Sequence, residues 1–148
     1  MGIWSEILER SVAGTDDAPH LAALRLPRID QWERGQVWAT WPVERKFLTP
    51  AVGSLFGGYV AALADHLLAF AVFTVLDDDE SFATSEIHVH FLRAVREGTL
   101  ELQARVVSRS KRSAYCELSI FDSDGQLVAR ASGTQVIRTA GGRVKVGT

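Results

Sequence analysis

One segment constrains the fold of this chain more than any other, the apolar run from Tyr59 to Leu76. Its apolar side chains recur at helical spacing, at Val60, Leu63, Ala64, Leu67, Leu68, Ala71, Val72 and Val75. The run approaches the length of a membrane span, but Asp65 and His66 lie in its middle, and a charge there costs about 2.5 kcal/mol or more in a bilayer. The segment therefore predicts one long helix, buried in a soluble protein.

The acidic residues Asp77 to Glu80 mark the end of this helix, because negative charge opposes the helix dipole there. Beyond them the hydrophobic period changes to two, which is the period of a strand. The alternating segments predict four strands, beginning at Phe82 and covering Gly98 to Arg109, Tyr115 to Phe121 and Leu127 to Ile137. The turn residues 122–125, Asp-Ser-Asp-Gly, separate the last two strands.

Ahead of the helix, the alternation from Gln36 to Val43 predicts a first strand. Two short helical pieces are expected in an N-terminal arm at residues 1–34, at Ile3 to Glu9 and at His20 to Leu24. The order is thus one strand, one long helix and four strands. A helix that is apolar over much of its circumference needs cover on several sides, and a curved antiparallel sheet provides it. We therefore expect a single α+β domain over 1–148 with the hotdog fold.

Composition excludes several classes of function. The formal net charge of −2 provides no overall basic field, so neither nucleic acid nor an anionic membrane is an expected partner. The single cysteine, Cys116, permits no internal disulfide, and the N-terminus lacks a signal peptide, which together indicate a cytoplasmic protein. There is no G-x-S-x-G nucleophile elbow and no Walker A lysine. No metal and no cofactor are expected.

Candidate chemistry begins at the Gly57-Gly58 pair, just ahead of the helix. Backbone N–H groups at a helix start can stabilise an oxyanion, although a tight turn would explain the glycines equally well. Asp65, mid-helix in apolar surroundings, is the candidate acid or base, against the alternative of an ordinary salt-bridged aspartate. Gly57 and Asp65 are about 12 Å apart along a helix. One carbonyl can reach both only if two subunits pair with antiparallel helices, which makes a dimer a requirement.

Several polar clusters allow more than one interpretation. Basic residues surround the turn between the third and fourth strands, at Arg105, Arg109, Lys111 and Arg112. They form either a solvated turn or a site for the phosphates of a nucleotide tail. Glu86, His88 and His90 share a strand face that we expect to be a polar surface or an oligomer contact rather than a metal site. His66 could orient Asp65 or be an ordinary helix residue.

The segments 53–58 (Gly-Ser-Leu-Phe-Gly-Gly) and 63–65 (Leu-Ala-Asp) closely resemble the phenylacetate-degradation, or PaaI-like, thioesterases of the hotdog superfamily. The similarity continues through residues 84–87, 91–95 and 124–129 and covers most of the chain after about Gly35. This resemblance implies an acyl-CoA thioesterase that releases a free acid and CoA. It also implies a homodimer, often paired into a tetramer, and an adenine nucleotide tail near the basic turn.

The resemblance also implies roles for individual residues. Gly57 matches the glycine whose N–H polarises the thioester carbonyl, and Asp65 matches an acidic residue, from the partner subunit, that acts as general base or nucleophile. Thr84 matches a position that helps to place the attacking water. The remaining candidates for substrate binding are Phe56, Gly58, Pro50, Arg109, Lys111 and Arg112.

Two departures from the family pattern keep other functions open. Phe56 stands where the family commonly has a histidine, and Pro50 where it has an asparagine, and neither side chain can donate a hydrogen bond. A non-catalytic acyl-CoA-binding protein is therefore the main alternative. A hotdog-fold hydratase acting on an enoyl thioester is a third, but the clear Asp/His dyad that this chemistry would favour is missing. The sequence does not identify the acyl group, which could be aromatic or a short or medium aliphatic chain.

Overall fold

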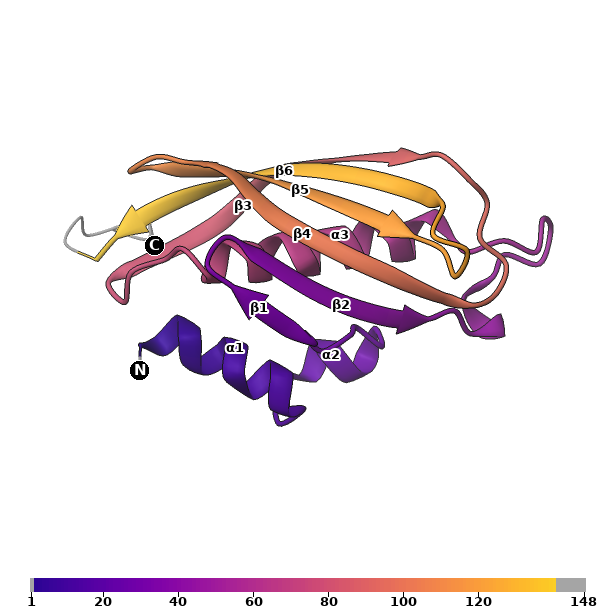
Figure 1. Ribbon diagram of the computed structural model, residues 1–148, viewed down its shortest axis with the longest axis horizontal. Coiled ribbons are helices and arrows are strands. Elements are labelled where there is room, and N and C mark those ends of the chain that lie inside the picture. The colour runs from indigo at the N-terminus through magenta and orange to yellow at the C-terminus, as the bar shows by residue number, and fades with distance from the viewer. Residues whose placement is uncertain (1, 141–148) are drawn as a thin grey trace, which may run out of the picture.

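The computed structural model describes residues 2–140 and contains a six-stranded antiparallel sheet curved around one long helix (Figure 1). The elements in chain order are α1 (Ile3–Ala13), α2 (Pro19–Ala23), β1 (Gln31–Glu33), β2 (Gln36–Pro42), the 3-10 helix η1 (Arg45–Phe47), α3 (Gly57–Phe73), β3 (Glu80–Phe91), β4 (Thr99–Arg109), β5 (Ser113–Phe121) and β6 (Leu127–Thr139). The strands are ordered β1-β2-β4-β5-β6-β3, so that β3 lies at one edge of the sheet.

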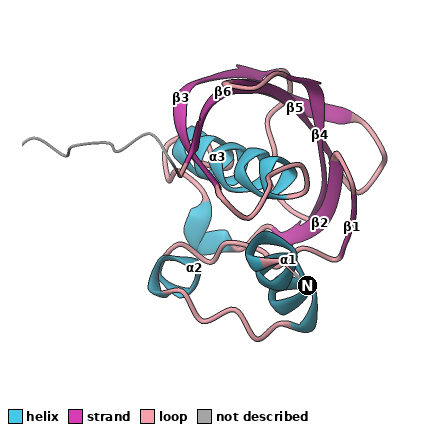
Figure 2. Ribbon diagram, turned by 90° about the vertical axis from the view of Figure 1, so that its left-hand side faces the viewer, coloured by secondary structure: helices cyan, strands magenta, loops and turns pink. Residues whose placement is uncertain are grey.

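Helix α3 lies inside the curve of the sheet, and helices α1 and α2 lie on the side of α3 that faces away from the sheet (Figure 2). The apolar residues of α3 are buried around most of the circumference of the helix, among them Leu63, Leu67 and Leu68, which have no exposed surface. The alternate residues Leu100, Leu102, Leu118 and Ile120 cover it from β4 and β5 and are also at most 1% exposed. Burial of this apolar surface is the main favourable contribution to folding. The curved antiparallel sheet around one long buried helix confirms the predicted α+β hotdog fold.

The N-terminal arm is held to the core by specific contacts. Trp4 of α1 stacks on Phe73 at the end of α3, with ring centroids 5.1 Å apart. The Ser11 hydroxyl, buried in α1, accepts a hydrogen bond of 2.9 Å from the N–H of Ile29. Helix α1 continues to Ala13, four residues beyond the predicted end, and closes on Gly14, whose φ of 73° suits glycine.

Two predictions of secondary structure were incomplete. Strand β1 was not predicted; it pairs with β2 through Trp32 and Val37 across a turn at Gly35, where φ is 86°. Three residues are too few to establish a hydrophobic period, so two strands and not one precede α3. The long helix ends at Phe73, before the acidic run, in a tightened last turn where the N–H groups of Thr74 and Val75 donate to the carbonyls three residues back. The Thr74 hydroxyl also donates to the carbonyl of Ala71, at 2.7 Å.

The remaining elements match their predictions closely. Strands β4, β5 and β6 begin or end within two residues of the predicted bounds, and β3 begins at Glu80, two residues before Phe82. Within residues 2–140, no helix is long and apolar enough to cross a membrane.

Candidate active site

Asp65 lies on the exposed side of α3, next to the edge strand. The hydroxyl of Thr84, on β3, donates a hydrogen bond of 3.2 Å to Asp65 Oδ1. A β-bulge between Thr84 and Glu86 interrupts the pairing of β3 with β6 at this point. Bulges re-aim side chains and are common beside active sites. The structure thus brings together two of the three residues predicted to be catalytic.

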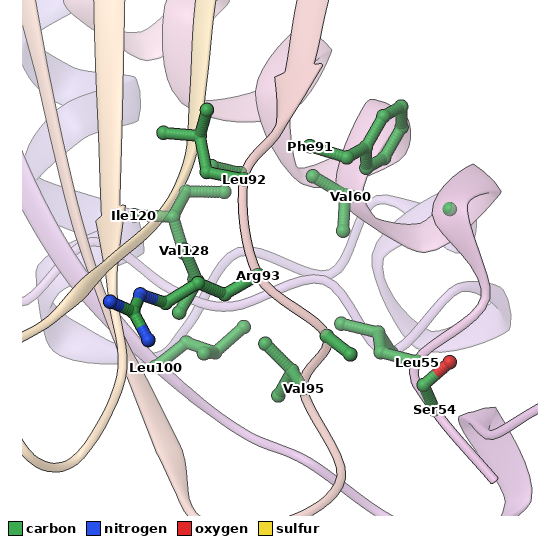
Figure 3. A pocket seen from close by; sticks show the side chains of 13 residues that line it. Ser54, Leu55, Val60, Phe91, Leu92, Arg93, Val95, Leu100, Ile120 and Val128 are labelled. Carbon is green, nitrogen blue, oxygen red and sulfur yellow. The ribbon is translucent and has the colours of Figure 1, made fainter.

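Gly57, the third, is the first residue of α3, so its N–H has no acceptor within the helix. A side chain could not be added there freely, because a Cβ would lie 3.2 Å from the ring of Phe91. Gly57 lines a cavity of about 350 Å³ between the start of α3 and the segment that follows β3 (Figure 3). The walls are mainly apolar, and Val60 and Phe91 lie together at one side of it (Figure 3). The free N–H therefore lies beside a space that a ligand can enter.

Asp65 does not line that cavity. It lines a second one, of about 460 Å³, between the arm and α3. The eight residues between Gly57 and Asp65 separate them by about 12 Å along the helix. Within one chain they therefore cannot act on the same carbonyl group.

The edge strand β3 offers a way to bring them together. In the described part of the chain, β3 pairs with β6 on one side only. Its other side presents backbone N–H and C=O groups to which a further strand can be added. Asp65 and Thr84 lie at this same edge, so a second copy docked there would contact the Asp65–Thr84 pair.

Phe56 and Pro50 lie in the segment that leads into α3. Phe56 precedes the helix, is 55% exposed and meets Tyr59 edge to face with ring centroids 6.4 Å apart. A Cβ on Gly58 would lie 2.3 Å from the Phe56 ring, so the present position of this ring requires glycine at 58. Pro50 is exposed in the loop before the helix. Neither side chain supplies a hydrogen bond to the Asp65–Thr84 pair.

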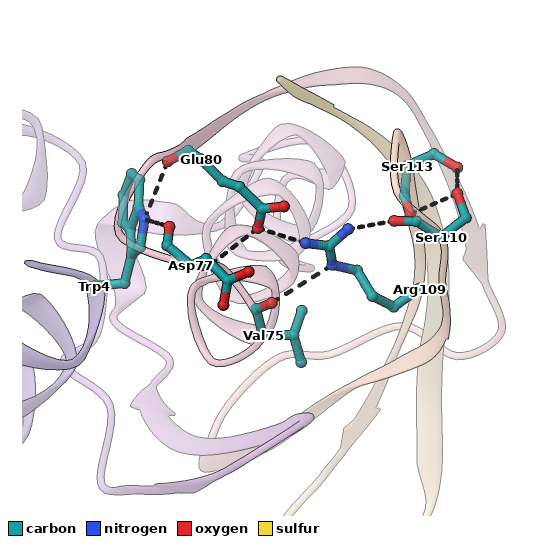
Figure 4. Close-up of polar contacts among 7 residues, drawn as sticks. All are labelled: Trp4, Val75, Asp77, Glu80, Arg109, Ser110 and Ser113. Carbon is teal, nitrogen blue, oxygen red and sulfur yellow. Dashed lines mark hydrogen bonds and ion pairs between the residues drawn. The ribbon is translucent and has the colours of Figure 1, made fainter. Parts of the chain in front are cut away.

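The basic turn lies at the other end of the fold from Gly57 (Figure 1). Arg109 donates to the carboxylate of Glu80 and, at 3.5 Å, to the carbonyl of Val75, just beyond α3 (Figure 4). Its side chain is only 22% exposed. Lys111 and Arg112, by contrast, are exposed. Of the predicted phosphate-binding residues, these two have their charges open to a ligand, whereas Arg109 is engaged inside the protein.

His66 is buried and joins α3 to the arm, since its Nε2 lies 2.7 Å from the carbonyl oxygen of Pro27. A carbonyl can only accept, so Nε2 carries the proton of this hydrogen bond. Burial lowers the pKa of His66, more than the Pro27 carbonyl raises it. His66 is thus neutral at pH 7 and turned toward the arm, which answers the question that the sequence left open.

Sequence reasoning missed Gln135, which lies directly opposite Thr84 in the β3–β6 ladder. Its side chain is fully buried, and neither its amide nitrogen nor its amide oxygen has a hydrogen-bond partner among the described residues. Alternation with Ile137 could have placed it on the inner face, but nothing in the sequence signals an unpaired amide.

The structure also places the polar face of β3 and the single cysteine. Glu86 and His88 are exposed on the outer side of β3, with 3.5 Å between the carboxylate and the ring, and His90 is exposed beside them. Cys116 is fully buried on the inner face, and burial raises the pKa of its thiol to about 12. Such a thiol remains protonated and unreactive at neutral pH.

Comparison with known proteins shows which family has this architecture. The profile of the Thioesterase superfamily matches residues 52–129, more than half of the chain. A Sulfurisphaera tokodaii protein, provisionally named an esterase, is 33% identical over 72% of this chain and 77% of its own length. A similarly named protein of Saccharolobus solfataricus is 36% identical over 61% of this chain, and the match spans 59% of that protein. The chain belongs to the thioesterase superfamily.

Solved structures make the assignment more particular. A thioesterase from Haemophilus influenzae shares the fold with a TM-score of 0.78, covering 90% of this chain and 91% of that one at 21% identity. A Ralstonia eutropha protein, provisionally described as a thioesterase related to phenylacetic acid degradation, gives 0.75 at 27% identity and covers 87% of this chain and 98% of its own. The resemblance to PaaI-like hotdog thioesterases is confirmed, and with it the class of enzyme, a thioester hydrolase.

Proposed function

We propose that this protein is an acyl-CoA thioesterase that hydrolyses an acyl-CoA to the free acid and CoA. The observation that carries the proposal is the hydrogen bond of 3.2 Å from Thr84 to Asp65, which fixes an exposed carboxylate beside a cavity. An acidic residue in this position can activate water or attack a carbonyl directly.

The proposed site is completed by a second copy of the chain. Two β3 edges pair in opposite directions, and the two α3 helices then run antiparallel. This arrangement places Gly57 of the partner subunit near Asp65, where its free N–H can donate to the thioester oxygen. The exposed edge of β3 and its closeness to Asp65 support this dimer. Pairing of dimers into a tetramer is a further expectation from the resemblance, and a cytoplasmic location is one from the single cysteine and the N-terminal sequence.

The reaction would proceed by addition and elimination. Asp65 takes a proton from water while the oxygen of that water attacks the carbonyl carbon. The carbonyl electrons move to the oxygen, which the N–H of the partner's Gly57 stabilises. The C–S bond then breaks, and the CoA sulfur leaves with the proton that Asp65 had taken. Direct attack by Asp65 would instead form a mixed anhydride, which water then hydrolyses.

Lys111 and Arg112 are proposed to bind the phosphates of CoA. The turn between β4 and β5, which carries them, lies at the end of the fold opposite the start of α3 (Figure 1). In an antiparallel dimer, the partner's Gly57 at Asp65 lies about 12 Å nearer to this end than Gly57 of the same chain does. The chain that supplies Asp65 would therefore also supply these two cations to the same substrate.

The test is release of CoA thiol from phenylacetyl-, benzoyl- and straight-chain acyl-CoAs. We expect Asp65→Asn and Asp65→Ala to lose at least 100-fold in kcat while the dimer persists in sedimentation. Undiminished turnover in both variants would show that Asp65 is not the catalytic residue. Cys116 does not interfere with thiol detection in the native protein, because its thiol is buried and protonated.

A non-catalytic acyl-CoA-binding protein is the second candidate, and Phe56 and Pro50 are the observations that favour it. These side chains supply no hydrogen bond to a water at Asp65. This candidate predicts saturable acyl-CoA binding by native dimers without thiol release. Turnover that disappears in the Asp65 variants would eliminate it.

A further inference from the structure

The cavity that Asp65 lines lies between α3 and the N-terminal arm. Helix α3 forms one side of it, and the arm lies across the other side (Figure 2). The residues that line it are mainly apolar and come from both sides: Ile7, Arg10, Asp16, Ala18, His20, Leu21, Leu24 and Leu26 from the arm, and Ala62, Asp65, His66, Ala69, Phe70 and Phe73 from α3. Its volume of about 460 Å³ lies within the range of ligand sites.

Few of its polar groups are free to attract a polar ligand inside. Arg10 forms an exposed ion pair with Asp17 at 3.7 Å, and His20 and Asp65 are exposed. The half-buried Asp16 accepts a hydrogen bond of 3.3 Å from the N–H of Ala18. Among the residues that line the cavity, His66 is the one that is both polar and buried, and its Nε2 is already hydrogen-bonded to the carbonyl oxygen of Pro27. Leu21, Leu26 and Phe73 are half-buried hydrophobic residues that a ligand would cover further. The interior therefore suits an aliphatic group.

We infer that this cavity binds the acyl chain of the substrate and that it selects straight chains of medium length, about eight to ten carbons. The inference rests on the proposed function, because Asp65 must lie beside the carbonyl carbon that is attacked. The acyl chain is attached to that carbon and enters the nearest apolar space, which Asp65 itself lines. The cavity at Gly57 is separate, and Asp65 does not line it.

The length follows from the helix that forms the wall. From Asp65 to Phe73 the helix rises about 12 Å. An extended chain with bonds of about 1.5 Å and angles of about 111° advances about 1.25 Å per carbon, so nine or ten carbons span this distance. Ala69 lies halfway between them in the helix and lines the cavity with a small side chain. Phe73, the last residue of α3, also lines the cavity.

The experiment compares kcat/KM across acetyl-, butyryl-, hexanoyl-, octanoyl-, decanoyl-, dodecanoyl- and phenylacetyl-CoA. For each methylene that becomes buried, kcat/KM should rise roughly threefold to fourfold up to the octanoyl or decanoyl substrate. It should then level off or fall. Ala69→Leu should lower the ratio of decanoyl to acetyl kcat/KM at least tenfold, because the larger side chain blocks the cavity.

Ala23→Leu is the matched control. It makes the same exchange on α2, at an exposed residue that does not line the cavity, and should leave the ratio within about twofold. If Ala69→Leu fails to fold, Leu21→Ala serves instead. That change removes an apolar contact from the arm side and should lower the same ratio threefold to tenfold.

The outcomes separate this inference from the proposed function. Thioester hydrolysis with the same kcat/KM for all chain lengths, or a ratio that Ala69→Leu does not change, would overturn the inference and leave the thioesterase intact. So would a clear preference for phenylacetyl-CoA. If no thioester is hydrolysed, calorimetry with decanoic acid still tests the cavity. Binding that Ala69→Leu weakens at least tenfold supports it, and absence of binding refutes it.

Discussion

Thr84 and Asp65 connect the edge strand to the middle of the central helix through a single hydrogen bond from the threonine hydroxyl to Oδ1, 3.2 Å long. Both residues are exposed, and their surroundings include the free side of β3. A hydroxyl group in this position holds the carboxylate in one rotamer, and its oxygen can accept a hydrogen bond from an incoming water. The pair is thus oriented before any substrate binds.

Replacement of Thr84 should lower the rate more than the binding of substrate. A hydrogen bond to a charged group is worth about 1.5–3 kcal/mol, which corresponds to roughly 10- to 100-fold in rate. We expect Thr84→Val to lower kcat by this factor with KM changed less than about threefold. Thr84→Ser keeps the hydroxyl and should retain most of the activity. Equal activity in the valine and serine variants would contradict a role for this hydrogen bond.

Gln135 should be a site where a substitution stabilises the protein. Its buried amide has no hydrogen-bond partner among the described residues, and an unpaired buried polar group costs about 1–3 kcal/mol. Gln135→Met has nearly the same shape without the polar atoms. We expect it to raise the free energy of unfolding by about 1 kcal/mol in urea denaturation. A decrease would instead mean that the amide binds an internal water.

His66 should make stability depend on pH. Its pKa in the folded state is lowered, mainly by burial, below the usual value of about 6.5. At a pH between the lowered pKa of the folded state and the usual pKa, His66 therefore binds a proton more readily in the unfolded chain than in the folded protein. The free energy of unfolding keeps this contribution above pH 6.5 and loses it as the pH falls toward the lowered pKa, by up to about 1.4 kcal/mol per pH unit.

His66→Gln is the control, because glutamine can still donate to the Pro27 carbonyl but does not titrate in this range. Denaturation in urea at pH 7.5, 6.5, 5.5 and 5.0 should give a smaller decrease for the variant than for the native protein. His20, Asp16 and Asp65 also act on His66 through their charges, and all three are retained in both proteins. Identical pH dependence in the two proteins would show that His66 does not contribute.

The sequence allowed some of these features to be predicted and not others, for physical reasons. Helix α3 and strands β4, β5 and β6 follow from hydrophobic periodicity, which is a local property of the chain. Gly57 and Asp65 were candidates from their positions at the start and in the middle of the apolar helix, whereas Thr84 came from the family resemblance alone, since periodicity does not show which side chains meet. The hydrogen bond from Thr84 to Asp65 lies beside the bulge in β3, a feature of sheet pairing that no local pattern reveals.

The contacts of the arm and of Arg109 were beyond prediction for a related reason. Pro27 and His66 are 39 residues apart, and Glu80 and Arg109 are 29 apart. Each pair meets only because the sheet and α3 bring distant segments together. From the sequence, Arg109 is one of four similar cations around a turn, and only the structure distinguishes the partly buried one from the exposed Lys111 and Arg112.

The Glu80–Arg109 ion pair should stabilise the end of the fold opposite Gly57. Burial raises the pKa of Glu80, but the hydrogen bonds from Arg109 and from the N–H of Asp77, together with the charge of Arg109, lower it on balance. Glu80 is 9% exposed and Arg109 22%. Glu80→Gln would leave the Arg109 charge partly buried without its counterion. We expect the free energy of unfolding at pH 7 to fall by about 2 kcal/mol, less than for a fully buried pair.

Glu117→Gln is the matched comparison, since Glu117 pairs at 3.1 Å with Arg105, which is 60% exposed. Exposed pairs contribute at most about 1 kcal/mol, so this variant should lose much less stability. The lowered pKa of Glu80 also means that its contribution is present above the usual carboxyl pKa and is lost as the pH falls through the folded value. The difference between the native protein and Glu80→Gln should therefore shrink in acid. An equal loss in both variants at pH 7, or a difference that grows in acid, would contradict this account of the pair.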